Sequence, residues 1–240
     1  MSIEHNGRNP RITLVATRTT DHLPLADGSV RDIPGGPAYH TGRALDRLGC
    51  PYQLFTGAPS HADVVFGPHG EDYIIPAIPL IPLPPRFDTP AVILSPIMQE
   101  IDPERLPAYD GYTFVDLQGF VREPMKPFYT VNRHFSLVHL FTRCTLVKAA
   151  EAELARLDDA SWEALESIVL VETHGSKGCI VRRGGRTTSI PASHVETEET
   201  IGAGDMFLAG IAVSMLDGAE PEDAAFKATA FVEGMLRSRR

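Results

Sequence analysis

Short, continuous apolar runs separated by longer segments constrain the fold of this 240-residue chain more than any other feature. The runs lie at residues 12–16, 52–55, 91–95, 113–117 and 168–172. Runs of this length fit strands that are buried on both faces, and such strands occur where helices cover both sides of a parallel sheet. The sequence therefore predicts an α/β fold built on a mainly parallel sheet.

Helices are predicted between these strands and at the end of the chain. Residues 37–48 place apolar side chains at helical spacing, after a Gly-Gly-Pro entry and before a glycine that suits a C-cap. Two long helices, at about 205–216 and 221–236, follow a glycine-containing hairpin at 179–190. The apolar stretch SLVHLFT, residues 136–142, is predicted as one more strand.

The segment between Pro76 and Pro90 differs in kind because it contains six prolines. Proline fixes φ and cannot donate to a strand ladder, so this segment is expected to connect elements around the sheet. We interpret residues 1–240 as a single domain with a small lid at about 23–32, and a contribution of part of 57–90 to that lid is left open. The polar residues before Ile12 are expected to be mobile.

Bulk properties exclude several classes of function. A formal net charge of −9 disfavours a general nucleic-acid surface, because phosphate binding needs clustered lysines and arginines. The cysteines Cys50, Cys144 and Cys179 are widely spaced and support neither a disulfide framework nor a cysteine zinc site. The sequence shows no signal-peptide core and no membrane-spanning run. A cytoplasmic protein that binds neither nucleic acid nor a membrane is expected.

The stretch TIGAGDMFLAG, residues 200–210, places small residues and one carboxylate at the start of a predicted helix. Backbone N–H groups at a helix start have no intrahelical acceptor, and Gly202, Ala203 and Gly204 let a ligand approach them closely. This arrangement predicts an anion site. For Asp205, the residues alone leave two roles open: a helix N-cap or first-turn acid, or a functional acid beside the anion.

Two common phosphate-binding loops do not account for this stretch. A Walker A loop requires GxxxxGK followed by Ser or Thr, which no segment satisfies. A dinucleotide-binding GxGxxG loop fails because Phe207 occupies the third glycine position and because the stretch lies near the end of the chain. The phosphate chemistry is therefore of another kind.

TIGAGDMFLAG resembles the DTxGAGDxFxxG signature of the ribokinase-like (PfkB) carbohydrate kinases. Further segments follow the order of that family. GGPAYHTGRALDRLG is similar to its N-terminal substrate motif, VETHGSKGC resembles its nucleotide-side TxGxxG segment, and VKAAEAEL lies where its KPNxxE element belongs. VDLQGFVR resembles the segment after a central strand in shorter members. The resemblance covers about residues 12–236, and the C-terminal motif is its specific part.

The resemblance implies a ribokinase-like three-layer α/β/α sandwich with a mainly parallel central sheet and a small, reduced β lid. It also implies transfer of the γ-phosphoryl group of ATP, or of another purine nucleotide, to a hydroxyl of a sugar, polyol or nucleoside, with Mg²⁺. Asp205 matches the catalytic base, and the amides of Gly202, Ala203 and Gly204 match the anion hole. Phosphoryl transfer asks a protein mainly for such positioning and charge stabilisation.

The resemblance also assigns substrate-binding and nucleotide-binding residues, because positions of this chain match those of the family motifs. Asp21, after the first strand, matches a hydroxyl-binding aspartate, with an exposed loop aspartate as the alternative. Gly35 and Gly36 match the diglycine against which the substrate lies. On the nucleotide side the matching residues are Thr173, Gly175, Gly178 and Thr200. An ordinary strand-to-hairpin connection is the alternative for that segment.

Two positions depart from the family pattern. His40 stands where the family usually has asparagine, and an imidazole differs in reach and can titrate near neutral pH. A partly buried helix residue is the alternative for His40. Ala150 replaces the asparagine of KPNxxE, which leaves Glu153 as the matching acid, implied to act on a metal ion through water.

The combination of THGSKGC, VDLQGFVR and VKAAEAEL looks more like the myo-inositol kinases than like ribokinase proper. The implied partners are a sugar, polyol or nucleoside and a nucleotide, and the oligomeric state, a homodimer included, is left open. The competing hypothesis is a ribokinase-fold sensor or regulatory protein that binds a nucleotide or sugar without turnover. Ala150 and His40 favour that hypothesis, and the intact GAGD opposes it.

Overall fold

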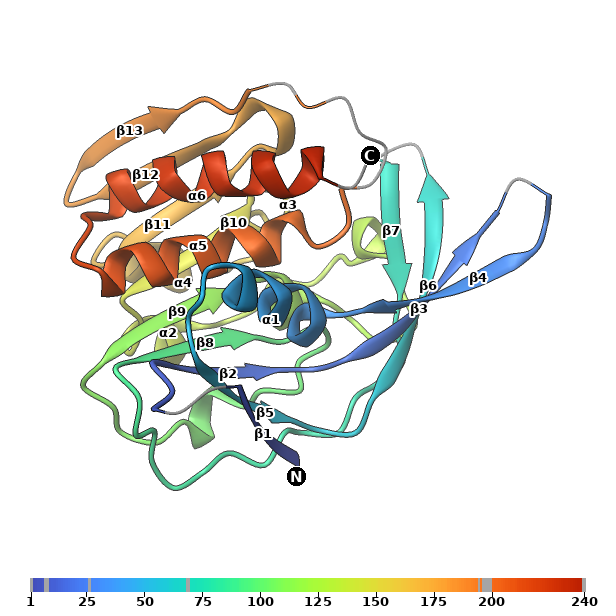
Figure 1. Ribbon diagram of the computed structural model, residues 1–240, viewed down its shortest axis with the longest axis horizontal. Helices are drawn as coiled ribbons and strands as arrows, with labels where there is room; N and C mark the ends of the chain where they lie inside the picture. Colours follow the sequence, from blue (N-terminus) through green and yellow to red (C-terminus); the bar gives the residue numbers. More distant parts are fainter. Residues whose placement is uncertain are drawn as a thin grey trace.

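The computed structural model describes residues 2–6, 9–25, 27–67, 70–193, 195 and 200–238. These residues form a large sheet between two layers of helices, and a smaller sheet projects from one end of it (Figure 1). None of the helices in these ranges has the length and apolar character that a bilayer crossing requires.

The large sheet contains nine strands within the described residues. Its six central strands run parallel, and antiparallel strands close both edges. In spatial order the strands are β1 (Ser2–Asn6), β5 (Tyr52–Thr56), β2 (Ile12–Ala16), β8 (Ala91–Ser95), β9 (Tyr112–Asp116), β10 (Leu146–Ala150), β11 (Val169–Thr173), β12 (Cys179–Arg183) and β13 (Arg186–Ile190).

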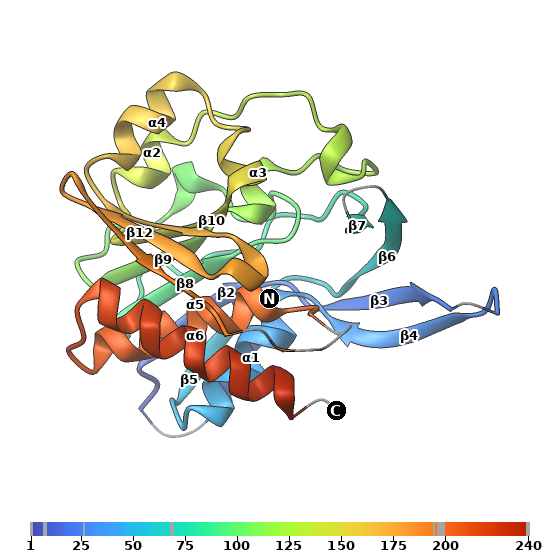
Figure 2. The same ribbon diagram turned by 90° about the horizontal axis from the view of Figure 1, so that it is seen from above.

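Helices cover both faces of this sheet (Figure 2). One face carries α1 (Pro37–Arg47), α5 (Ala203–Leu216) and α6 (Pro221–Arg237), and the other carries α2 (Val138–Phe141), α3 (Glu151–Leu154) and α4 (Asp159–Leu165). Each face has its own apolar core, because neighbouring residues of a strand point to opposite sides: Ile93 packs with α5, whereas Leu94 packs with α2. The predicted three-layer α/β/α sandwich is therefore confirmed.

Local sequence explains how the helices on the first face begin. α1 starts after Gly36, whose φ of +79° favours glycine, and Pro37 lies in the first turn, where its missing N–H is not needed. α6 also opens with a proline, Pro221, followed by acids that suit the positive end of the helix dipole. α5 packs against both α1 and α6 and is buried along most of its length, which explains its nearly uniform apolar sequence.

The strand predicted at 136–142 is wrong. Residues 138–141 form the short helix α2, and the next central strand is β10, at 146–150. A short apolar run is compatible with a strand or with a buried helix turn, and here Leu140 and Phe141 reach the core from one side of a helix. β10 was hidden because Lys148 interrupts its apolar character.

The N-terminal residues expected to be mobile instead include β1, which pairs antiparallel with β5 at the edge of the large sheet. Backbone N–H and C=O groups make the ladder, so a polar sequence can still form an edge strand. The short 3₁₀ helices are η1 (Pro103–Arg105), η2 (Gln118–Val121), η3 (Phe128–Thr130) and η4 (Gly175–Lys177).

The second sheet contains four strands within the described residues and is wider than the lid predicted at about 23–32. Its order is β4 (Val30–Gly35), β3 (Thr19–Pro24), β6 (Ser60–Gly67) and β7 (Gly70–Ile74). β3 and β6 pair in parallel, so two hairpins that are distant in sequence join in one sheet. The lid predictions at residues 26, 68 and 69 lie outside the described residues.

The proline-rich segment 75–90 contains no helix or strand and returns from the second sheet to the large one. Its Ile81 N–H donates to the Glu100 carbonyl at 2.7 Å, which ties it to the loop after β8. Its role as a connecting segment agrees with the backbone limits that proline imposes.

Candidate active site

Asp205 lies in the first turn of α5, at the carboxyl end of β8. Ser95, the last residue of β8, donates its hydroxyl to Asp205 Oδ1 at 3.5 Å. The N-cap residue of α5 is Gly202, and among the described residues no side chain makes a cap hydrogen bond there. Asp205 is therefore not the N-cap but an acid in the first turn of α5, and the residue is 8% exposed, with its carboxylate beside Ser95 of the sheet.

A row of polar side chains lies beneath Asp205 on three neighbouring strands: Ser95 and Asp116 end β8 and β9, and Lys148 is the middle residue of β10. Lys148 Nζ contacts both carboxylate oxygens of Asp116, at 2.9 and 2.8 Å. Both side chains are buried, and Lys148 and Asp116 are directly paired in the strand register. Ligands bind at this edge in open α/β sheets because the carboxyl ends of parallel strands converge there.

The pKa of Asp205 is raised to about 7, mainly by burial and also by the charge on Asp116. The Lys148 ammonium, the Ser95 hydroxyl and the Arg122 guanidinium act in the opposite direction. A carboxyl group with a pKa near 7 can accept a proton efficiently near neutral pH, which is what a general base needs. Asp205 has the electrostatic setting of an acid–base group.

The predicted anion hole lies at the turn that opens α5. Gly202 has a φ of +76°, and a Cβ atom there would lie 2.2 Å from the His40 ring, so this position requires glycine. A Cβ at Gly204 would lie 3.0 Å from Lys148 Nζ. The Ala203 N–H donates to the Thr200 carbonyl at 3.0 Å and is thus used by the turn itself. The amides of the glycines remain the candidates for anion binding.

Asp21 lies at the junction of the second sheet with the large one. It is 2% exposed, and Thr19 donates its hydroxyl to Asp21 Oδ1 at 2.5 Å. A Cβ at Gly35, on the paired strand, would lie 2.0 Å from Asp21 Oδ2, so the glycine makes room for this carboxylate. A Cβ at Gly36 would lie 2.7 Å from the Thr17 carbonyl. The structure therefore brings Asp21, Gly35 and Gly36 together, and Asp21 is not an exposed loop acid.

Burial raises the pKa of Asp21, while the Thr19 hydroxyl, His22 and Arg122 oppose that shift. Arg122 follows η2 and lies with its guanidinium over the Tyr73 ring of β7, 5.4 Å from the centroid. Its Nε is buried and has no hydrogen-bond partner among the described residues. The charge on Arg122 opposes the raised pKa of both Asp21 and Asp205, so this cation acts on both buried carboxylates.

His40 connects the first motif to the anion hole. It lies on α1, is 7% exposed, and its ring packs against Gly202. Tyr39 contacts that ring edge-on, with centroids 5.1 Å apart. His40 is thus a buried contact of the GAGD turn, and a smaller side chain at this position would change the turn's packing.

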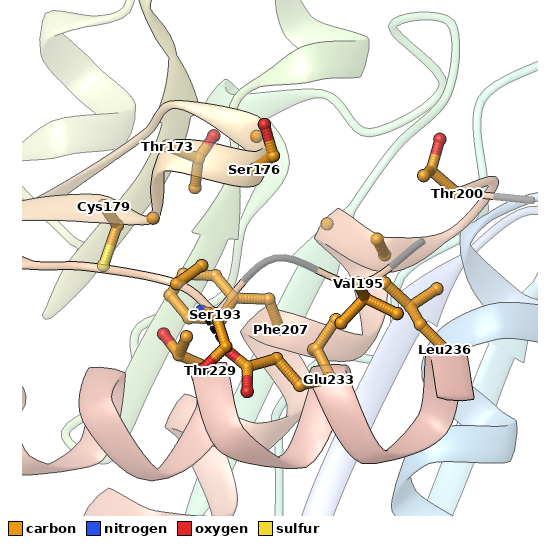
Figure 3. A pocket seen from close by; sticks show the side chains of 16 residues that line it. Thr173, Ser176, Cys179, Ser193, Val195, Thr200, Phe207, Thr229, Glu233 and Leu236 are labelled. Carbon is orange, nitrogen blue, oxygen red and sulfur yellow. Dashed lines mark hydrogen bonds between the residues drawn. The ribbon is translucent and has the colours of Figure 1, made fainter. Parts of the chain in front are cut away.

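A cavity of about 430 Å³ lies between the β11–β12 loop and α5 and α6 (Figure 3). All four predicted nucleotide-side residues line it, together with two residues of the anion hole; they are Thr173, Gly175, Gly178, Thr200, Ala203 and Gly204. Apolar side chains, including Phe207, Val232 and Leu236, form much of the remaining wall. The cavity has the size and the apolar lining of a small-molecule site, and it opens onto the first turn of α5.

Gly178 shows why this loop cannot be replaced freely. Its φ is +97°, and a Cβ there would lie 2.0 Å from the Ile190 carbonyl on β13. Close backbone packing of the hairpin against the loop therefore depends on the missing side chain. On the opposite wall, Glu233 of α6 accepts a hydrogen bond from the Ser193 N–H at 2.5 Å (Figure 3).

Comparisons with known proteins agree with this geometry. Residues 135–233 match the sequence model of the pfkB family carbohydrate kinases. A protein of Pyrococcus horikoshii named "Putative sugar kinase PH1459" is 34% identical over 71 residues, which cover 30% of this chain and 23% of that protein. This sequence match is therefore confined to part of both chains.

Solved structures extend the similarity to nearly the whole chain. A pyrophosphate-dependent kinase in the ribokinase family, complexed with a pyrophosphate analog and myo-inositol, matches with a TM-score of 0.69 and 19% identity over 94% of this chain and 95% of that chain. The Burkholderia thailandensis nucleoside kinase in complex with inosine matches with a TM-score of 0.72 and 15% identity over 94% and 91%. The Arabidopsis thaliana ribokinase with ribose and ATP matches with a TM-score of 0.64 and 16% identity over 95% and 93%.

The chain has the ribokinase-like fold. The similarity confirms the resemblance to the ribokinase-like (PfkB) kinases that the sequence motifs indicate. Within this fold, His40 of the first motif contacts the GAGD turn, and residues of that turn and of the β11–β12 loop line one cavity.

The predicted metal residue of this ribokinase-like site fits a protein-bound Mg²⁺ poorly. Glu153 accepts the Ala150 N–H at 2.8 Å and so caps α3. Burial raises the pKa of Glu153, with the charge on Lys148 opposing it. Ala150 offers no side-chain ligand, and no cluster of three metal-binding side chains occurs in the described ranges. Mg²⁺ ordinarily needs only one or two carboxylates when it arrives with nucleotide phosphates.

Sequence reasoning missed four polar residues of the site: Ser95, Asp116, Arg122 and Lys148. The signal was present, because Ser95 is the last residue and Asp116 the second-last residue of an apolar run predicted as a strand. The carboxyl end of a parallel strand is where ligand-binding side chains gather. Lys148 and Arg122 lie within VKAAEAEL and VDLQGFVR, whose resemblance to the family concerns each whole segment rather than these two side chains.

Proposed function

We propose that this protein is a phosphotransferase that moves the γ-phosphoryl group of ATP, or of another purine nucleotide, to a hydroxyl of a small polyol, sugar or nucleoside. The observation that carries the proposal is the position of Asp205. Its buried carboxylate, with a pKa of about 7, belongs to the residue that follows Gly204, and Gly204 lines the cavity of the nucleotide-side residues and is part of the glycine turn of the proposed anion hole.

In the proposed step, the acceptor hydroxyl gives its proton to Asp205 while its oxygen bonds to the γ-phosphorus. The bond from that phosphorus to the β–γ bridging oxygen breaks, and the electron pair leaves with the nucleoside diphosphate. The amides of Gly202 and Gly204 stabilise the charge on the moving group, because helix-start N–H groups favour an anion. Asp205 returns its proton to solvent after the phosphorylated product leaves.

The donor is proposed to lie in the 430 Å³ cavity, with its purine against the apolar wall and its phosphates toward Gly204. Mg²⁺ would then arrive with those phosphates, since the described side chains do not form a ligand set of their own. The structural neighbours include both an ATP complex and a pyrophosphate-dependent kinase, so pyrophosphate belongs among the donors to be assayed.

The acceptor is proposed to lie between Asp21, His40 and Arg122, opposite Asp205. A buried carboxylate can accept two hydroxyl donors and a guanidinium can donate to several oxygens, which suits a polyol. Myo-inositol is the first acceptor to assay, because the motif combination resembles the myo-inositol kinases and a structural neighbour binds it. The proposal also takes the protein to be cytoplasmic, and it includes a homodimer as one assembly state.

A second candidate is a ribokinase-fold protein that binds these ligands without turnover. Ala150 in place of asparagine and the capping role of Glu153 favour it, because both remove groups implied to manage the metal ion. The raised pKa of Asp205 favours the kinase, since a pure binder has no use for a base near neutral pH.

One experiment separates the two. The purified protein is incubated with Mg²⁺ and ATP, GTP or pyrophosphate, against a panel of polyols, sugars and nucleosides, and products are identified by mass spectrometry and ³¹P NMR. A phosphomonoester that forms with the wild type and not with Asp205→Asn supports the kinase. Ligand-dependent increases in melting temperature without any phosphorylated product across the panel would support the binder.

A further inference from the structure

A buried ion pair lies directly under the anion hole. Lys148 Nζ is 2.8 Å from Asp116 Oδ2, and the exposed fractions of the two side chains are 6% and 0%. The Gln118 N–H also donates to Asp116 Oδ1, at 3.2 Å. Asp116 is therefore held from two sides, by the backbone of η2 and by the ammonium of β10.

The ammonium faces the anion hole rather than the apolar core. Lys148 shares the α5 side of β10 with Leu146, while Val147 and Ala149 point to the opposite core. Because a Cβ at Gly204 would lie only 3.0 Å from Lys148 Nζ, the glycine leaves a short open path between this cation and the first turn of α5.

Stability gives little reason for a buried pair at this place. The desolvation of two charges usually offsets their attraction, so apolar residues of similar volume would serve the fold as well. The site does supply a reason. A donor phosphate brings negative charge to Gly204, and Lys148 is the described cation nearest to that glycine by the contacts above.

We propose that Lys148 binds the phosphoryl group that enters the anion hole at Gly204, and that Asp116 is the positioning residue that holds the ammonium there. The inference deepens the proposed kinase function and rests on it. Lys148 thus supplies the donor phosphates with a positive charge from the protein itself. In the neighbouring segment, which is implied to bind the metal ion, Ala150 offers no side-chain ligand and Glu153 caps α3.

The first test measures donor binding by isothermal titration calorimetry, with ATP and Mg²⁺ as one ligand and adenosine as the matched ligand without phosphates. Lys148→Met is expected to weaken ATP binding by about 10- to 100-fold, the usual loss of a charge-assisted hydrogen bond, and to leave adenosine binding unchanged. Arg11→Gln serves as the control, because it removes a surface cation paired with Asp217 at 2.7 Å, remote from the site. Equal ATP affinity in Lys148→Met and wild type would overturn the proposal.

Removing one partner of a buried pair can unfold a protein, so the double variant Lys148→Met with Asp116→Asn leaves no charge unpaired. It is expected to fold and to bind ATP as weakly as Lys148→Met. An ATP affinity restored to the wild-type value in the double variant would show that the single variant failed through misfolding, and would overturn the proposal.

The second test uses the pH profile of kcat/KM. If the two residues had only a structural role, their substitution would not shift the acid limb of this profile in opposite directions. The charged groups facing Asp205 are Asp116 from β9, Lys148 from β10 and Arg122 after η2, with Ser95 as a hydroxyl donor from β8. Lys148→Met should move the acid limb to higher pH and Asp116→Asn should move it to lower pH, each by about one pH unit. In the double variant the two shifts should largely cancel.

The two failures are distinguishable. If the wild type phosphorylates no acceptor, the kinase function fails, while the ATP titrations still decide whether Lys148 binds phosphate. If the wild type is a kinase, the positioning role of Asp116 is refuted when the acid limb of kcat/KM does not shift in the two single variants, or shifts in the same direction in both.

Discussion

Replacing Asp205 by asparagine should separate the two consequences of burying a carboxylate at this site. The substitution keeps the shape of the side chain, and removes both the proton acceptor and the charge. Loss of a general base lowers turnover by about 10²- to 10⁴-fold. The same change should stabilise the fold at high pH, because the buried carboxylate is costly when it is ionised.

The size of that stabilisation follows from the pKa of Asp205, which burial raises from 3.8 to about 7. The native state therefore holds the proton more tightly than the unfolded chain does. The stability contributed by this protonation is fully present below pH 4 and is lost as the pH rises to about 7. At 1.36 kcal/mol for each pKa unit, the loss amounts to about 4 kcal/mol as an upper figure.

The measurement is urea unfolding of wild type and Asp205→Asn at pH 4.5 and at pH 8, with turnover measured in parallel. Other titrating groups cancel in the difference between the two proteins at each pH. The asparagine variant should gain stability relative to wild type by about 2–4 kcal/mol on going from pH 4.5 to pH 8. An unchanged difference would refute a raised pKa, and surviving turnover would refute the base.

Three further predictions follow from the same geometry. Gly178→Ala should lower the melting temperature by about 5 °C or more, because its Cβ would meet the Ile190 carbonyl; Gly184→Ala, also at positive φ but with nothing within 4 Å, is the matched control and should cost less. Arg122→Gln should raise the KM of the acceptor by about tenfold and leave ATP affinity unchanged, and a change in ATP affinity alone would place Arg122 on the donor side. His40→Asn should change the ranking of acceptors in the panel more than nucleotide binding, and an unchanged ranking would return His40 to a packing role.

Hydrophobic pattern and local backbone chemistry predict much of this fold. The largely apolar runs at 12–16 and 91–95 are central strands that are buried along their whole length, and the Gly-Gly-Pro entry starts α1 because φ at Gly36 is positive. Such signals act over a few residues, so they can be recognised from the sequence alone. The run at 136–142 misled the prediction because a short apolar segment has no distinct period.

The environment of the candidate site residues depended more on tertiary structure than on local sequence. By sequence, TIGAGD identifies an anion site and a carboxylate, and leaves Asp205 as cap or base. Only the fold buries that carboxylate beside Ser95, Asp116 and Lys148, from three strands that are separated along the chain. Burial and the charge on Asp116 raise its pKa to about 7, and Lys148 and Ser95 oppose the rise. Desolvation depends on everything that surrounds a group, and no local segment encodes it.

The second sheet and the acceptor side show the same division. Asp21 and Gly35 each had a predicted role, but their contact arises because β3 and β4 pair in one register. The sequence by itself determined which residues suit strands, helix starts and an anion turn, since these follow from side-chain polarity and φ. The tertiary structure alone decided that Lys148 faces Gly204, that the charge of Arg122 acts on both Asp21 and Asp205, and that β6 and β7 join β3 and β4 in the second sheet, because these depend on long-range strand order and burial.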